Sequence, residues 1–160
     1  MDRLHGVLQE LLQDHKELRR RMKEIQDYLQ KVGFSNGDRL GKTAGEELYL
    51  MQKALSEAIK THERKEERLM AATLAKPGAA AEALLKTVEG DHKTLDCLLQ
   101  ILDSMSDLRD QHTTYAIRFT AHSLAYALER HLDYEEKNVF PLVARTLSSA
   151  LAPMEQAGTQ

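Results

Sequence analysis

Apolar positions recur along the chain with the alternating three- and four-residue spacing of one face of an α-helix. The first such stripe runs through Leu4, Leu8, Leu11, His15, Leu18, Met22, Ile25 and Leu29. It predicts a long amphipathic helix that ends at residues 32–45, where glycines and Asn36 stop helices. One position of the stripe is a histidine where an apolar residue is expected.

A second stripe follows a predicted helix start near Thr43, which forms a capping box with Glu46. Its members are Leu48, Met51, Leu55, Ala58 or Ile59, His62, Glu66, Leu69 and Thr73. Here both a histidine and a glutamate occupy positions that should be apolar.

Two further stripes complete the pattern. The third helix should begin after "AKPG", with Pro77 near its start, where a missing N–H costs nothing. Its stripe contains Ala81, Leu85, Val88, His92, Leu95, Leu99 and Leu102. Beyond the polar segment "DSMSDLRDQ", the fourth stripe contains Ile117, Thr120, Leu124, Ala127 or Leu128, His131, Glu135, Asn138 or Val139, and Leu142. We expect Pro141 to kink or end this fourth helix.

Short connections between consecutive long helices make neighbours antiparallel, which favours an all-α, up-down-up-down four-helix bundle. Strands are not expected, because aromatic residues make up only 5% of the chain and β-branched residues do not alternate. We assign residues 1–148 to the bundle and residues 149–160 to a flexible C-terminal tail. At about 1.5 Å rise per residue, His15, His62 and His92 lie at similar depths from the connections between their helices. Histidines of neighbouring helices can therefore face each other.

The composition restricts the class of protein. The 160 residues, 42% of them hydrophobic, suit one domain with a single core. The net charge of -3, with acidic and basic residues interspersed, excludes a nucleic-acid partner. No apolar run approaches the roughly 18 residues that cross a bilayer, and the charged N-terminus differs from a signal peptide. Because Cys97 is the single cysteine, no internal disulfide forms, and we expect a cytoplasmic protein without a membrane partner.

The histidines and glutamates inside the stripes predict a metal site. Burying carboxylates without a compensating cation costs several kcal/mol each, and the four stripes contain no lysine or arginine. Imidazole and carboxylate groups are good ligands for iron, manganese or zinc, so a metal centre resolves this cost. The candidate ligands are His15, His62, Glu66, His92, His131 and Glu135.

The spacing adds detail to this prediction. A histidine and a glutamate four residues later lie on the same side of a helix and can converge on one site, as in the pairs His62–Glu66 and His131–Glu135. Six ligands exceed the four of a closed zinc site, which favours two metal ions with the two glutamates as bridges. Glu67 and Glu136 lie one position further round and are interpreted as outer partners or solvent-exposed groups.

The four segments "DHKEL", "HERKEE", "GDHKTLD" and "HLDYEEKNVFP", in this order, resemble the hemerythrin-like, or HHE cation-binding, family over nearly the whole chain. The resemblance implies a left-twisted bundle that holds a non-haem di-iron site, bridged by the two glutamates and a solvent-derived oxygen. It also implies a small-molecule ligand, O2, NO or peroxide, or a role in sensing or handling iron. The implied iron ligands are His15, His62, Glu66, His92, His131 and Glu135.

The chain departs from the oxygen-carrying hemerythrins that it resembles. Those proteins place a second histidine four residues after the first on the third helix, where this chain has Asp96. Their fourth helix carries its carboxylate as an aspartate five residues after the histidine, whereas here Glu135 follows His131 by four. One coordination position is therefore left to Asp96, to water or to an incoming ligand.

Two alternatives remain at the level of sequence, and a third, the ferritin-like class, is disfavoured by its motif. A redox-inert bundle would hold zinc or manganese in the same site. A helical interaction or phosphotransfer-type module would hold no metal, but it needs one exposed histidine and not four buried at one level. Ferritin-like carboxylate proteins use Glu-x-x-His, which reverses the order found here. The sequence predicts a metal protein and assigns it no enzymatic reaction.

Overall fold

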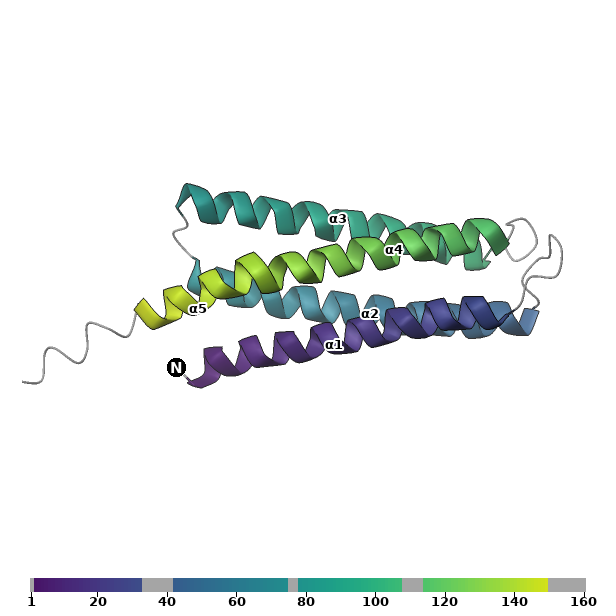
Figure 1. The fold of residues 1–160 in the computed structure, drawn as a ribbon, viewed down its shortest axis with the longest axis horizontal. Helices are drawn as coiled ribbons and strands as arrows, with labels where there is room; N and C mark the ends of the chain where they lie inside the picture. Colours follow the sequence, from purple (N-terminus) through teal and green to yellow (C-terminus); the bar gives the residue numbers. More distant parts are fainter. Residues whose placement is uncertain (1, 33–41, 75–77, 108–113, 150–160) are drawn as a thin grey trace, which may run out of the picture.

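The computed structural model describes residues 2–32, 42–74, 78–107 and 114–149, and all of its elements are helical. The elements are α1 (Asp2–Lys31), α2 (Lys42–Thr73), α3 (Ala79–Asp107), α4 (Thr114–Tyr134), the π-helical segment η1 (Glu135–Val139) and α5 (Phe140–Ser149). Helices α1 and α3 run in one direction, α2 and α4 return, and α5 continues the line of α4 (Figure 1). This arrangement confirms the predicted all-α, up-down-up-down four-helix bundle.

The fourth helix of the bundle is made of α4, η1 and α5 together. Helix α1 packs beside α2 and α4, and α3 packs beside α2 and α4, so the four helices enclose one central axis. Of the predicted tail, Ser149 is the last residue of α5, and residues 150–160 lie outside the described residues.

The core along this axis consists of two clusters of buried apolar side chains, which we call the connection-side and the terminus-side clusters. The first lies toward the α1–α2 and α3–α4 connections, and the second lies toward the N-terminus of α1 and α5 (Figure 1). The stripes predicted from the sequence supply most members of both clusters. Examples are Leu18, Leu55, Leu95 and Leu128 in the connection-side cluster, and Leu11, Leu69, Val88 and Val139 in the terminus-side cluster.

The helix boundaries differ from the predicted ones in two places. Helix α3 continues to Asp107, through part of the predicted polar connection, because Met105 packs against the connection-side cluster and contacts Thr120 at 3.7 Å. Helix α2 begins at Lys42, which agrees with the predicted start near Thr43, although Thr43 itself lies one residue inside the helix.

The helix also neither ends nor simply kinks at Pro141. It widens into the five-residue π-helix η1, in which the Phe140 N–H donates to the Glu135 carbonyl, and continues as α5. Pro141 has no N–H to donate to the carbonyl four residues earlier, and its ring would clash with that carbonyl in a regular α-helix. A wider turn immediately before the proline avoids both problems.

Among the described helices, none combines the length and the apolar character that crossing a membrane requires.

The apolar stripes should dominate the stability of the bundle. Leu55 of α2 is fully buried, and replacing it with alanine should lower the free energy of unfolding by about 2–5 kcal/mol through lost burial and a cavity. Leu50 on the same helix is 64% exposed, so Leu50→Ala should change the free energy of unfolding by no more than about 0.5 kcal/mol. Urea unfolding followed by circular dichroism measures both values, and equal losses would contradict this assignment of the core.

Candidate metal centre

A layer of polar side chains separates the two apolar clusters. On α1, His15 lies between Leu11 of the terminus-side cluster and Leu18 of the connection-side cluster. The predicted histidines and glutamates of the other helices lie at the same level, since each replaces one apolar residue of its stripe. The layer consists of His15, His62, Glu66, His92, His131 and Glu135.

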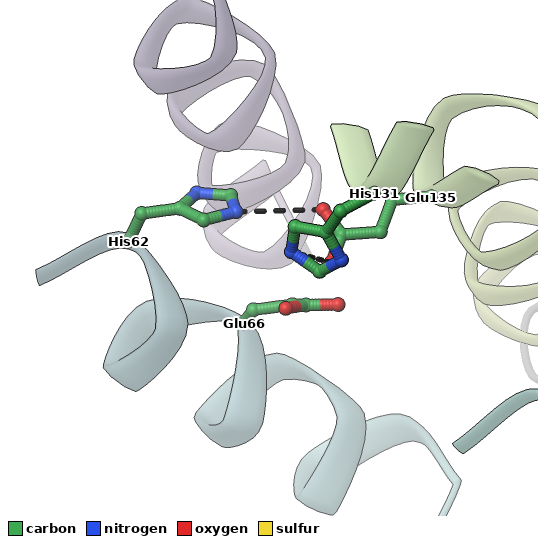
Figure 2. Close-up of side chains that lie close together, drawn as sticks. All are labelled: His62, Glu66, His131 and Glu135. Carbon is green, nitrogen blue, oxygen red and sulfur yellow. Dashed lines mark ion pairs between the residues drawn. The ribbon is translucent and has the colours of Figure 1, made fainter. Parts of the chain in front are cut away.

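Burial of this layer is nearly complete. The side chains of His15, His62, Glu66, His131 and Glu135 are at most 1% exposed. The His92 side chain is 13% exposed and lies at the side of the layer that is nearest to solvent. Figure 2 shows four members of the layer, contributed by α2 and by the fourth helix, pointing toward one another.

The Glu135 carboxylate connects two pairs of histidines. Its Oε2 lies 3.0 Å from His15 Nε2 and 3.4 Å from His62 Nε2. Its Oε1 lies 3.0 Å from His131 Nε2 and 4.0 Å from His92 Nε2. The two imidazoles of each pair are neighbours, with ring centroids 4.8 Å apart in both pairs. Each oxygen of one carboxylate therefore faces its own pair of imidazole nitrogens.

Glu66 completes the layer from α2. Its Oε2 lies 3.3 Å from His92 Nε2. Each of His62, Glu66, His131 and Glu135 offers a ligand atom, and these atoms all lie within 4.8 Å of one another. His15 and His92 join this group through their contacts with Glu135, so the structure brings together all six residues that the sequence predicted. Their role as metal ligands remains a prediction.

His15 has a second carboxylate partner. Its Nδ1 lies 2.8 Å from Glu136 Oε1, in a hydrogen bond that joins α1 to η1, and Arg19 Nη1 donates to the same oxygen at 2.7 Å. The beginning of η1 thus presents consecutive carboxylates to the two nitrogens of one imidazole. Glu136 is an outer partner of the layer, whereas Glu67 is exposed.

The layer has the unsatisfied donors and acceptors that a cation would satisfy. Within the described residues, both carboxylate oxygens of Glu66 and of Glu135 are buried without a hydrogen bond, as are the Nε2 atoms of all four histidines. The short distances between these carboxylate oxygens and Nε2 atoms lack the orientation of a hydrogen bond. Among the described residues, no lysine or arginine pairs with Glu66 or Glu135. Buried polar groups are rarely left in this state, so the six residues fit a site for metal ions.

Burial also sets the protonation of the layer. It lowers the pKa of His62 to about 4 and that of His131 to about 3, so both imidazoles are neutral near neutral pH. Burial, together with the neighbouring Glu66 carboxylate, raises the pKa of Glu135 well above its ordinary value. Neutral imidazoles have the free lone pair that metal binding requires, whereas the raised pKa of Glu135 disfavours the carboxylate form that binds a metal.

Two acidic residues lie beside His92 on the more open side of the layer. Glu63 was not among the predicted site residues, but its Oε1 is buried without a hydrogen bond, and burial raises its pKa to about 7. The spacing in the sequence could have identified Glu63, because it lies three residues before Glu66 and hence on the same side of α2. Asp96, one turn after His92, is half-buried and lines a cavity of about 290 Å³ between α2 and α3.

A buried layer of imidazoles and carboxylates on facing helices, without a lysine or arginine among the described residues to pair with its carboxylates, is typical of four-helix bundles that bind metal ions. A model of the hemerythrin HHE cation-binding domain matches residues 3–144, which include the whole layer. The chain belongs to this family, as the sequence motifs predicted. No curated protein and no solved structure matches the chain.

Metal binding should release protons at a pH below the raised pKa of Glu135. A metal binds the carboxylate form of Glu135, so the affinity should rise with pH until the pH exceeds this pKa. The neutral His62 and His131 contribute no proton. Calorimetric titration with Mn²⁺, at one pH in two buffers of different ionisation enthalpy, measures the protons released. Identical binding enthalpies in both buffers would contradict proton release from the site.

Proposed function

We propose that this protein holds two iron ions in the bundle and that the pair binds or reduces a small molecule. The supporting observation is the position of Glu135, whose two oxygens face two separate pairs of histidines. A single ion would leave one pair without a partner, whereas two ions allow one carboxylate to serve both. Glu66, which approaches His92, is the second carboxylate that both ions could share.

The set of donor atoms favours iron over zinc. Four imidazoles and two carboxylates are more ligands than the four that a closed zinc site takes. Imidazole and carboxylate together suit iron, and family membership supports a cation in this place. Manganese or zinc in the same residues would give a redox-inert protein, which the experiment below distinguishes.

The chain's own residues prepare the site in three ways. Burial keeps His62 and His131 neutral, so that their nitrogens are available as ligands. The two apolar clusters exclude water along the bundle axis on both sides of the layer. The two carboxylates would offset part of the positive charge of the bound ions. Two iron ions would supply the ability to exchange electrons with a bound molecule.

We propose O2, NO or peroxide as the small molecule, and an iron-sensing or iron-handling role as the alternative use of the same site. The more open side of the layer, at His92, supports access by a small molecule. Asp96 stands there in place of the additional histidine of the oxygen-carrying hemerythrins, which argues against simple reversible oxygen carriage. A reducing cytoplasm is the compartment that we propose, and there ferrous iron is available.

The first test is the metal content. Protein produced with added iron should contain about two iron ions per chain and show a visible absorption that bleaches on reduction. His62→Ala and Glu66→Ala should each lower the iron content while leaving the helical circular dichroism largely unchanged. His122, exposed on the outer side of α4, provides the matched control, and His122→Ala should retain the wild-type iron content.

The outcomes separate the alternatives. A folded protein that takes up no metal would overturn the proposal and favour an interaction module. Tight binding of zinc or manganese, with no change on reduction, would indicate the redox-inert bundle. If iron is bound, mixing the reduced protein with O2, NO and peroxide in separate stopped-flow experiments identifies which of them oxidises or binds the centre.

A further inference from the structure

Three histidines of the layer direct their Nδ1 atoms, which face away from Glu135, toward a carboxylate on another helix. For His15 the partner is Glu136, at hydrogen-bonding distance as described above. For His62 of α2 the nearest carboxylate is Asp14 of α1, with 3.9 Å between Nδ1 and Oδ2. For His131 of α4 it is Asp91 of α3, with 4.0 Å between the same two atom types. The same relation thus recurs at three of the four imidazoles.

A basic side chain holds each of these carboxylates in place. Arg19 binds Glu136, and Lys65 Nζ lies 2.7 Å from Asp14 Oδ2. Arg130 Nη2 donates to Asp91 Oδ1, which leaves Asp91 Oδ2 for the histidine. Because these cations lie outside the layer, they fix the carboxylates without neutralising Glu66 or Glu135.

We propose that Asp14 and Asp91 are positioning residues that orient His62 and His131 for the metal ions, as Glu136 orients His15. This assignment rests on the proposed metal-binding function. The Nδ1 atoms of His62 and His131 are buried and make no hydrogen bond within the described residues. A shift of about 1 Å would bring each to hydrogen-bonding distance of its aspartate.

Helix geometry explains how the sequence achieves this arrangement. Asp14 directly precedes His15, and Asp91 directly precedes His92. Consecutive residues of an α-helix point about 100° apart, so the histidine faces the bundle axis while the aspartate faces the neighbouring helix. Each Asp-His pair therefore supplies a metal-facing imidazole of its own and the outer carboxylate for the histidine of the adjacent helix.

The chemical consequence concerns the tautomer and the basicity of the imidazole. A neutral histidine that binds a metal through Nε2 carries its proton on Nδ1, and a carboxylate that accepts this proton in a hydrogen bond fixes both tautomer and ring orientation. The same hydrogen bond makes Nε2 a stronger electron donor. Loss of Asp14 or Asp91 should consequently weaken metal binding although neither residue touches the metal.

The test compares metal binding by Asp14→Asn and Asp91→Asn with two matched controls. Asp27 on α1 pairs with Lys23, and Glu89 on α3 pairs with Lys93, so Asp27→Asn and Glu89→Gln remove a lysine-paired carboxylate from the same helices, on the surface. The dissociation constant for Co²⁺ is measured on the full chain by competition with a chelator, together with the visible spectrum of the bound Co²⁺. Thermal unfolding of each metal-free variant reports on folding separately.

The two aspartate variants should bind Co²⁺ about 10–100-fold more weakly than the wild type and show shifted visible bands. The two controls should match the wild type in both measurements. Equal affinity and equal spectra in all four variants would overturn the positioning role while leaving the proposed function intact. A wild-type protein that binds no metal at all would overturn both.

If Asp91→Asn lowers the unfolding temperature, a second variant tests the role of Asp91 without replacing it. Arg130→Gln leaves Asp91 in place and removes only the ion pair that holds it. The Arg130 side chain is 56% exposed, so its loss should not disturb the core. It should weaken Co²⁺ binding in the same direction as Asp91→Asn, by a smaller factor and without loss of folding. Unchanged affinity and an unchanged Co²⁺ spectrum in Arg130→Gln would count against the role of this ion pair.

Discussion

The rest of the structure depends on the burial of Glu66 and Glu135 in a layer that contains no lysine or arginine among the described residues. Two carboxylates in one dry space repel each other and lose the water that stabilises their charge, which is why the pKa of Glu135 is raised well above its ordinary value. A helical bundle of this size could fill the same space with leucine. That it keeps carboxylates and imidazoles there is an argument for a bound cation, because a cation offsets the cost of burying the carboxylates.

Packing and electrostatic interactions have separate roles in the structure around the layer. The two apolar clusters supply the stability of the bundle and hold the helices at fixed depth, so the ligand residues need not stabilise the fold themselves. Charged side chains outside the layer then connect the helices in pairs. Arg19 is one of these connections, since it reaches Glu129, Asp133 and Glu136 from α1. The exception to this enclosure is the side of His92, where Glu63 and Asp96 lie and where the layer is nearest to solvent.

Helical periodicity explains why the sequence predicted so much of this. The residues of the α2 stripe lie on one face because they follow the helical repeat. Any helix that buries Leu55 and Leu69 must therefore also bury His62 and Glu66 between them. The antiparallel order followed from short connections, and the common depth of the histidines followed from the constant rise per residue. Local propensity did not fix the end of α3 or the form of the helix at Pro141. The end of α3 depended on the packing of Met105, whereas the helix passes Pro141 through the widened turn of η1, one of several ways in which a helix can accommodate a proline.

The amino-acid sequence by itself determined the fold class, the six residues of the polar layer and the family, because all of these depend on residue type and on spacing along single helices. The tertiary structure alone decided how the histidines pair, which oxygen of Glu135 faces which pair, and that Glu136 reaches His15 across 121 positions of sequence. It also decided that Asp14 and Asp91 lie beside histidines of other helices. These relations lie between helices, where the relative rotation of two packed helices sets the contacts, and no periodicity within one helix specifies that rotation.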